Sequence, residues 1–302
     1  MRVGVIVPVG GPTRWLEASL ASILAQDPPP DRVVVVDDGG DPSLTLPPPL
    51  AARCEVVRRG QRGGPAAARN AGLALLDTEL VAFADADDEW LPGKLAVQRG
   101  SFEAGAETAL CFGRVEVIGP DGTRTGERWF EPPAGEIAPE RLAALLYEHN
   151  PVVLSTVVAR RAALEEAGGF APGLDPVEDL DLWLRLAAAG GRFVFAPDAR
   201  VRYRRHGGAL TADVGALAEA ALRVHRIHAG LVDPAVRDRV LARDLRALAQ
   251  GRIRRRRHRE ARTLLREATA LQAPTAGQRL RAGVLAVPGL RRALGHRDPY
   301  RR

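Results

Sequence analysis

Short apolar runs alternate with helix-like segments in the first part of the chain. The runs over residues 2–9 and 31–38 are rich in β-branched residues, which is typical of strands that are covered on both faces. The segment between them predicts a helix with Thr13 as its N-cap, because its apolar residues recur at helical intervals: Leu16, Leu20, Ile23 and Leu24.

The same alternation continues further along the chain. Residues 65–78 predict a second helix, and residues 79–85 predict a third strand. Strands that alternate with helices form βαβ units, so we expect an α/β domain with a mainly parallel sheet flanked by helices. Sheets of this kind bind their ligands at the carboxyl ends of the strands.

Acidic residues directly follow two of the predicted strands. They are Asp37 and Asp38 after the second strand, and Asp85, Asp87 and Asp88 after the third. Carboxylates that crowd together raise one another's pKa unless a cation neutralises them, and oxygen ligands favour Mg²⁺ or Mn²⁺. A divalent-cation site that also takes substrate phosphates is one interpretation, and ordinary turn residues after a strand are the other.

Composition limits the classes of protein that fit. The chain has 302 residues, 46% of them hydrophobic, which is enough for a full core plus an appendage. Cys54 and Cys111 are too few for a disulfide framework or a zinc site and fit a reducing cytosol. No run approaches the ~20 apolar residues of a membrane span, and no signal peptide is recognisable. We therefore expect a cytoplasmic protein, with any membrane contact peripheral, at the inner face of the plasma membrane.

Basic charge is concentrated near the end of the chain. The net charge is +6, and every basic residue except Lys94 is an arginine, as a GC-rich coding bias would produce. Arginine is densest over residues 251–262, and leucine recurs at helical spacing throughout this part of the chain. Three interpretations stay open: a helical appendage on the main domain, a basic face that rests on anionic lipid, and a nucleic-acid surface. The last is disfavoured because no aromatic residues are interleaved for base stacking.

Four motifs occur in a fixed order between residues 2 and 210. They are VIVPVG (5–10), VVVVDDGG (33–40), GGPAAARNAGLALLDTELVAFADADDEWLPGKL (63–95) and GGFAPGLDPVEDLDLWLRLAAAGGRFVFAPDARVRYRRHG (168–207). Together they resemble the inverting family 2 glycosyltransferases, which have the GT-A fold. Gly10 and Gly11 depart from the family pattern, which usually has an aromatic residue and Asn there, and Gly40 stands where serine is usual.

The resemblance implies a site for a nucleotide-diphosphate-sugar donor, with a UDP-sugar favoured. Asp38 matches the position that hydrogen-bonds the base, and Arg69 lies where it could offset pyrophosphate charge. The full set of donor-binding residues implied is Pro8, Val9, Asp37, Asp38, Arg69, Asn70 and Asp85.

The resemblance also implies the metal site and the catalytic residues. Asp85 and Asp87 match the DxD motif, with Asp87 as the direct metal ligand and Asp85 closer to the ribose or sugar. His206 matches a histidine near the metal and the diphosphate. The implied metal set is thus Asp87, Asp85 and His206, holding Mn²⁺ or Mg²⁺. Asp179 matches the catalytic base, and Glu178 precedes it in the same catalytic segment.

The expected protein is a GT-A-like catalytic domain over residues 1–210 followed by an arginine-rich helical extension over 211–302. It would be a hexosyltransferase that works with metal assistance and inversion, because one base without a covalent intermediate implies direct displacement. The acceptor is an unidentified hydroxyl, lipid-linked acceptors included, in polysaccharide or glycoconjugate biosynthesis. A nucleotidyltransferase and a non-catalytic binding protein with a basic tail are the alternatives.

Overall fold

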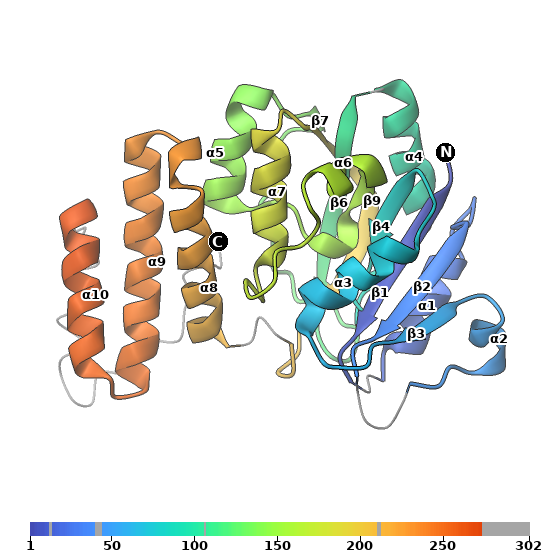
Figure 1. The fold of residues 1–302 in the computed structure, drawn as a ribbon, viewed down its shortest axis with the longest axis horizontal. Helices are drawn as coiled ribbons and strands as arrows, with labels where there is room; N and C mark the ends of the chain where they lie inside the picture. Colours follow the sequence, from blue (N-terminus) through green and yellow to red (C-terminus); the bar gives the residue numbers. More distant parts are fainter. Residues whose placement is uncertain (12–13, 40–43, 106, 210–212, 274–302) are drawn as a thin grey trace. The chain divides into compact units, whose positions relative to one another are not determined.

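The computed structural model describes residues 1–11, 14–39, 44–105, 107–209 and 213–273 (Figure 1). The chain divides into two compact units, Met1–Leu210 and Thr211–Arg302. Each unit has its own core of buried apolar side chains. The first unit contains both acidic clusters that follow predicted strands, and the second contains the arginine-rich run.

Strands and helices alternate through the first half of the first unit, as the apolar pattern predicts. The elements of this unit are β1 (Val3–Val9), α1 (Leu16–Leu24), β2 (Arg32–Asp37), α2 (Pro48–Ala51), β3 (Glu55–Arg58), α3 (Gly64–Leu75), β4 (Leu80–Phe83), β5 (Glu89–Trp90), α4 (Lys94–Ala104), β6 (Thr108–Ile118), β7 (Gly135–Glu136), α5 (Pro139–His149), β8 (Val158–Arg160), α6 (Arg161–Glu166), α7 (Glu178–Ala188) and β9 (Arg192–Arg204). The short elements α2 and β3 were not predicted. Helix α2 has four residues and none of them is buried, and β3 is an edge strand with mostly exposed side chains and no long apolar run.

The described strands form one sheet in the order β3-β2-β1-β4-β8-β6-β9-β5, with β7 paired to β9. The predicted α/β class is confirmed, and β3, β2, β1 and β4 run parallel as expected. Beyond β4 the sheet is mixed, because β8 runs antiparallel to both β4 and β6. Since β2 and β4 both run parallel to β1, the two acidic clusters come to the same edge of the sheet.

The two faces of β1 pack against different helices. Val5 and Val7 share a buried cluster with Ile23 of α1. Ile6 points the other way, toward α3, where a Cβ atom on Gly72 would come within 2.6 Å of the Ile6 Cγ2 atom. Successive residues of a strand face opposite sides of the sheet. A strand that is covered on both sides therefore needs the unbroken apolar run that the sequence shows.

Helix α1 begins differently from the prediction. Trp15 occupies the N-cap position and its side chain makes no capping hydrogen bond. Thr13, the expected N-cap, lies outside the described residues. The indole of Trp15 instead donates to the carbonyl of Pro120 at 3.3 Å and packs against the ring of His206, with centroids 4.5 Å apart. The N-cap residue of α1 is therefore an aromatic residue held by ring contacts, and not the threonine with a capping hydroxyl that was predicted.

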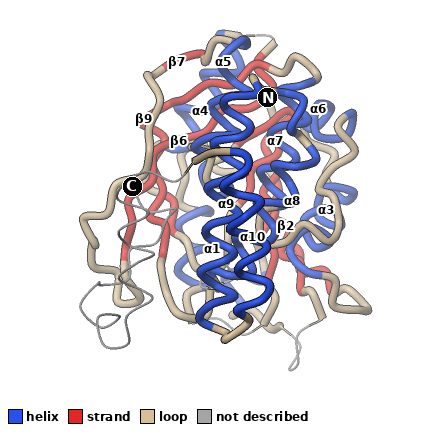
Figure 2. Tube along the Cα trace, turned by 90° about the vertical axis from the view of Figure 1, so that its left-hand side faces the viewer, coloured by secondary structure: helices blue, strands red, loops and turns tan. Residues whose placement is uncertain are grey.

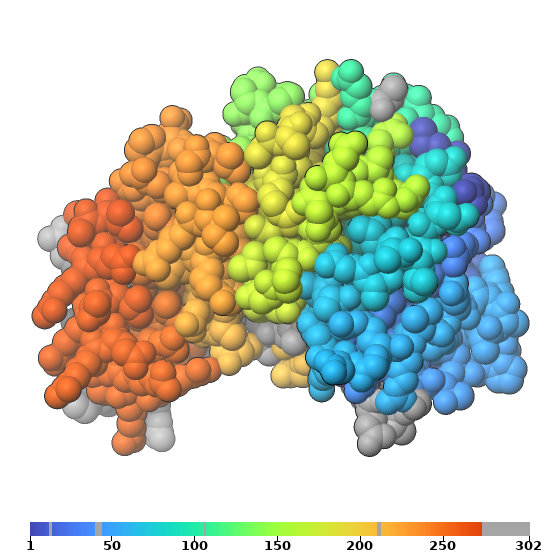
Figure 3. All heavy atoms as spheres, viewed as in Figure 1, coloured from blue at the N-terminus to red at the C-terminus, as the bar shows by residue number. Residues whose placement is uncertain are grey.

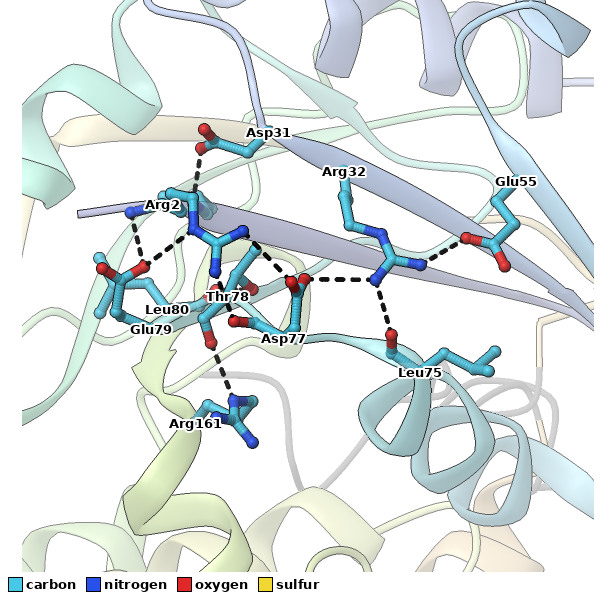
Figure 4. A network of polar contacts seen from close by, with 11 residues as sticks. Arg2, Asp31, Arg32, Glu55, Leu75, Asp77, Thr78, Glu79, Leu80 and Arg161 are labelled. Atoms are coloured by element: carbon cyan, nitrogen blue, oxygen red, sulfur yellow. Dashed lines mark hydrogen bonds and ion pairs between the residues drawn. The ribbon is translucent and has the colours of Figure 1, made fainter.

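Ion pairs join the amino ends of the strands, at the edge opposite the acidic clusters (Figure 4). Arg32 at the start of β2 donates to Glu55 at 2.6 Å and to the carbonyl of Leu75, at the end of α3, at 2.7 Å. Arg2 pairs with Asp77 at 3.3 Å. Arg2, Glu55 and Asp77 are exposed to solvent and Arg32 is partly exposed, so each pair contributes little to stability.

The described part of the second unit is a row of helices: α8 (Val214–Ile227), a 3₁₀ turn (Ala229–Leu231), α9 (Pro234–Arg254) and α10 (His258–Leu271). Figure 2 shows α9 and α10 side by side. Helix α9 begins with Asp233 at the N-cap and Pro234 in the first helical turn, where proline is favoured. The predicted helical character is confirmed for 213–273, whereas residues 274–302 of the expected extension lie outside the described residues. Within the described ranges, no helix combines the length and the apolar character that crossing a bilayer requires.

A lysine is buried in the core of the first unit. Lys94, at the start of α4, is 0% exposed, and its ammonium group lies 3.8 Å from the centre of the Trp90 ring. Its Nζ atom has no hydrogen-bond acceptor among the described residues. Burial lowers the pKa of Lys94 to about 7, from its ordinary value of 10.5.

We expect the Lys94→Met variant to unfold less readily than the wild type at neutral pH, by about 2 kcal/mol. Burying the ammonium ion costs about 1.4 kcal/mol per unit of pKa shift, and the contact with Trp90 offsets part of that cost. The cost is fully present below pH 7 and fades as the pH rises toward 10.5, where the unfolded chain also loses the proton. Urea denaturation of both proteins across this pH range measures the difference.

The comparison also has a clear negative outcome. If the two proteins were equally stable at pH 7, the Trp90 ring would fully compensate the buried charge. If the gain did not shrink with rising pH, it would come from apolar packing of the methionine side chain and not from removal of the charge.

Candidate functional site

The turn after β4 brings three carboxylates to the carboxyl edge of the sheet. The amide of Asp85 donates to Ser155 Oγ at 3.0 Å, which fixes the start of the turn. Asp88 is buried and accepts a hydrogen bond from the amide of Arg204 at 2.9 Å. Asp85 and Asp87 keep part of their side chains exposed. The turn therefore offers two carboxylates to a ligand and uses the third to attach itself to β9.

Crowding changes the acidity of this turn. Burial raises the pKa of Asp87, and the negative charge of Asp85 raises it further. Burial and then the charges of Asp87 and Asp85 raise the pKa of Asp88 well above its ordinary range. Like charges at short range oppose one another's ionisation, so this edge of the sheet favours a cation.

Arg69 of α3 is the centre of a buried ionic cluster. Its side chain is only 6% exposed and pairs with Glu178 at the start of α7 and with Asp85 at 2.9 Å. Burial opposes the charged form of Arg69, but the charges of Asp85 and Glu178 outweigh burial and raise its pKa. One guanidinium thus ties α3 to α7 and to the turn after β4. The surfaces of α3 and of the chain around α6 and α7 meet on one face of the first unit (Figure 3).

Contacts beside this cluster fix the approach to α7. The side-chain amide of Asn70 exchanges two hydrogen bonds with the backbone of Phe170, at 2.8 and 2.9 Å. The Phe170 ring meets Phe83 of β4 edge-on, with centroids 5.3 Å apart. Gly169 is required between them, because its φ is +68° and a Cβ atom would come within 2.7 Å of Asn70 Oδ1.

Three acidic residues in the first turn of α7 have three different environments. Glu178 is buried against Arg69, and Asp181 pairs with Arg185 at 2.7 Å. Asp179 keeps partial exposure. Protein atoms nevertheless crowd its carboxylate, and this desolvation, followed by the charge of Glu178, raises the pKa of Asp179 to about 7. Of the three, Asp179 combines access to solvent with affinity for a proton at neutral pH.

Asp87 and His206 are brought together as the metal-site prediction requires. His206 Nε2 lies 2.7 Å from Asp87 Oδ2. The amide of Gly208 donates to His206 Nδ1 at 3.2 Å, so in the neutral ring the proton lies on Nε2 and is donated to Asp87. Asp85, the third predicted ligand, is paired with Arg69 instead.

The described residues include no group of three or more His, Cys, Asp or Glu side chains that is arranged to hold a metal ion. Asp87 and His206 form a set of two, beside an excess of negative charge. Mg²⁺ and Mn²⁺ accept few protein ligands when substrate phosphates and water complete the coordination. The pair therefore fits a cation that is shared with a bound substrate and that displaces the Nε2 proton of His206.

Asp37 and Asp38 are buried at the end of β2. The carboxylate of Asp38 accepts hydrogen bonds from the amides of Gly63 at 3.1 Å and Gly64 at 2.8 Å, and it also pairs with Arg59. Asp38 thus satisfies the first amides of α3, as a helix cap does. The carboxylate of Asp37 accepts from a backbone amide of the following loop at 3.2 Å. A base contact through Asp38 would compete with these bonds.

The other residues predicted to contact the donor differ in exposure. Pro8, at the end of β1, is partly exposed, whereas Val9 is 2% exposed and belongs to the core. The amide of Asn70 is engaged by Phe170. Pro8 therefore keeps access to solvent, whereas the side chain of Val9 is buried and that of Asn70 is already hydrogen-bonded.

Several residues of the site were missed by the sequence analysis. Arg204 is 4% exposed, donates to the carbonyl of Asp87 at 2.9 Å and pairs with Glu89. Nothing in the sequence distinguishes it from the arginines around it, because its burial depends on the register of β9. Ser155 and Arg59 belong to no recognisable motif, and their contacts with Asp85 and Asp38 join distant segments.

Comparison with known proteins gives a consistent result. Residues 5–168 match the family described as glycosyl transferase family 2. The chain is 32% identical over 165 residues to the pre-mycofactocin glycosyltransferase of Mycobacterium tuberculosis, which covers 51% of this chain and 33% of that protein. It is 28% identical over 172 residues to the O-antigen biosynthesis protein RfbC of Myxococcus xanthus, covering 57% and 13% of the two chains. The chain thus spans about a third of the length of the M. tuberculosis protein and a smaller share of the M. xanthus protein.

Solved structures of TarS from S. aureus share the fold. TarS 1–349 in complex with UDP-GlcNAc superposes with a TM-score of 0.61 at 21% identity, over 82% of this chain and 72% of TarS 1–349. TarS 1–349 in complex with UDP gives the same TM-score at 18% identity, over 91% and 93% of the two chains.

We expect the Arg69→Met variant to lose about 3–5 kcal/mol of unfolding free energy, because Glu178 and Asp85 then lack their buried cationic partner. Urea denaturation followed by tryptophan fluorescence measures this loss. All four tryptophans lie in the first unit, so the signal reports on the unit that contains the cluster.

The double variant Arg69→Met/Glu178→Met is the matched control. Replacing both members of a buried ion pair with apolar side chains is often close to neutral, so we expect it to recover most of the lost stability. A double variant as unstable as the single one would show that packing of the Arg69 stem, rather than the unpaired charge, matters.

Proposed function

The chain belongs to glycosyl transferase family 2, and on this premise we propose that it transfers a sugar from a nucleotide-diphosphate donor to an acceptor hydroxyl with inversion. The observation that carries the mechanism is Asp179. It is a partly exposed carboxylate with a pKa of about 7, and the nearby negative charge of Asp85 is one of the causes that raise this pKa. A carboxylate of this pKa is substantially deprotonated at neutral pH and can accept the proton of an attacking hydroxyl.

The donor is assigned to the edge of the sheet that carries the DxD motif. Asp85 and Asp87 form this motif, and Asp87 with His206 would hold Mn²⁺ or Mg²⁺. When bound, the cation supplies positive charge to the diphosphate leaving group. The base is proposed to be uracil, a proposal supported by the likeness to TarS, whose structures contain UDP-GlcNAc or UDP.

Arg69 is proposed to position the site rather than to bind the pyrophosphate. Its charge is already balanced by Asp85 and Glu178, and its side chain is almost wholly buried. Its ion pair with Asp85 holds that carboxylate toward the ribose or sugar, and its pair with Glu178 fixes the start of α7. Glu178 thereby supports Asp179 without itself taking the proton.

Inversion follows from the use of a single base. The acceptor oxygen forms a bond to the anomeric carbon while the bond from that carbon to the phosphate oxygen breaks. The hydroxyl proton passes to Asp179, and the nucleoside diphosphate leaves with its electron pair. No covalent bond to the protein forms, so the configuration at the anomeric carbon is inverted.

We further propose that residues 1–210 are the catalytic domain and residues 211–302 its helical extension. The acceptor is a hydroxyl compound of polysaccharide or glycoconjugate biosynthesis, with lipid-linked acceptors included. A cytoplasmic location is supported by Cys54 and Cys111, which are buried free thiols. Membership of the family favours sugar transfer over nucleotidyl transfer and over non-catalytic binding.

We expect Asp179→Asn to lower kcat about 10²- to 10⁴-fold, because the amide cannot accept the hydroxyl proton. Binding of the nucleoside diphosphate should persist. In the wild type, kcat/KM should fall about tenfold per pH unit below pH 7, since protonation of Asp179 removes the base. Release of UDP from a panel of UDP-sugars with hydroxyl acceptors measures both effects.

Asp181→Asn is the matched control, because Asp181 lies on the same turn of α7 but pairs with Arg185. This variant should keep the rate and the pH profile of the wild type. If Asp179→Asn retained full activity while Asp181→Asn lost it, the assignment of the base would be wrong.

We expect UDP to bind the wild type with Mn²⁺ and to bind at least tenfold more weakly when a chelator is present. Asp87→Ala should show the weak binding in both conditions, because it lacks the carboxylate that holds the shared cation. Isothermal titration calorimetry measures the dissociation constants without requiring a known sugar or acceptor.

Asp77→Ala is the matched control for this experiment. Asp77 is an exposed carboxylate at the opposite edge of the sheet, so its loss should leave UDP binding unchanged. UDP binding that is insensitive both to chelator and to Asp87→Ala would argue against a metal-assisted donor site.

A further inference from the structure

The two units of the chain carry opposite net charge. Residues 1–210 contain 22 basic and 29 acidic side chains, whereas residues 211–302 contain 21 basic and 8 acidic ones. A coding bias toward arginine acts on the whole chain and does not account for this difference. The described arginines are densest where α9 ends and α10 begins, and the charges of this part of the second unit therefore require a separate explanation.

Helix α10 has a packed face and an arginine face. Ala261 and Ala268 are buried, and Leu264 and Leu271 pack against the core of the second unit. These residues recur at helical spacing and form one side of the helix, which lies beside α9 (Figure 2). The opposite side carries three exposed arginines that also recur at intervals of three and four residues: Arg259, Arg262 and Arg266. We call these three residues the arginine face.

Acidic side chains nearby are directed to other arginines. Glu260 pairs with Arg252 at 3.1 Å, and Glu267 pairs with Arg226 of α8. Among the described residues, none of the three arginines of the arginine face has an acidic partner within ion-pair distance. Arginines four residues apart on a helix repel each other slightly, so the arginine face does not stabilise α10.

We propose that the arginine face binds the surface of an anionic phospholipid membrane. Guanidinium groups bind phosphate through paired hydrogen bonds, and a helix with one packed and one basic face can lie flat on headgroups. Leu265 is 38% exposed and lies between Arg262 and Arg266 in sequence, where an apolar side chain can enter the headgroup region. Residues 211–302 contain no Phe or Trp and a single Tyr, so they lack the stacking surface of single-stranded nucleic-acid sites.

The test uses the full chain and vesicles, and it does not depend on the proposed enzyme activity. Vesicles of phosphatidylcholine alone are compared with vesicles that contain about one third phosphatidylglycerol, in a flotation assay at low and high salt. The wild type should float with the anionic vesicles at low salt, be released at high salt, and remain unbound by the neutral vesicles.

The decisive variant is Arg259→Gln/Arg262→Gln/Arg266→Gln. Each arginine near an anionic surface contributes about a factor of five to binding, so the triple variant should bind about a hundredfold more weakly. The matched control is Arg2→Gln/Arg53→Gln/Arg141→Gln, which removes the same charge from exposed positions of the first unit and should bind like the wild type. Circular dichroism and the melting temperature confirm that both variants are folded.

Several outcomes would overturn the proposal. They are absence of binding to anionic vesicles, equal binding to neutral vesicles, and equal loss in both triple variants. A fourth is tighter binding of an RNA oligonucleotide than of vesicles at the same salt concentration, with the loss confined to the variant of the arginine face. That result would assign the surface to nucleic acid.

Discussion

A guanidinium group that is buried between two carboxylates determines the geometry of the proposed catalytic edge. Arg69, Asp85 and Glu178 come from a helix, a turn and a second helix that are far apart in the sequence. Each charge alone would be costly to bury, so each element requires the other two to be in place. The position of Asp179, next to Glu178 on α7, follows from this cluster.

The acidic residues of the site are chemically alike, but their partners separate their functions. Asp38 satisfies the first amides of α3, Asp88 attaches its turn to β9, and Asp181 pairs within its own helix. Those carboxylates are buried, and each has a protein partner. Asp87 and Asp179 keep partial exposure and raised pKa values, which are the properties that a ligand-binding or proton-accepting group needs.

Local pattern was enough to predict the α/β class, the first strands and helices, and the shared edge of the two acidic clusters. Apolar runs report burial directly, and parallel pairing then places the strand ends together. The partners of the acidic side chains were not predictable in this way. The bonds from Arg204 to Asp88 and from Arg59 to Asp38 depend on strand register and on loop paths, which no local pattern records. For the same reason, the resemblance that implied a base contact for Asp38 gave no sign that its carboxylate also accepts hydrogen bonds from two backbone amides.

The opposite charges of the two units also change the meaning of the isoelectric point. The value of about 10.2 is a sum over the whole chain, whereas at neutral pH the first unit is an anion and the second a cation. A polyampholyte of this kind attracts its own neighbours in dilute buffer, and added salt screens that attraction. Its solubility therefore rises with moderate ionic strength. A cation exchanger binds the second unit, and an anion exchanger binds the first.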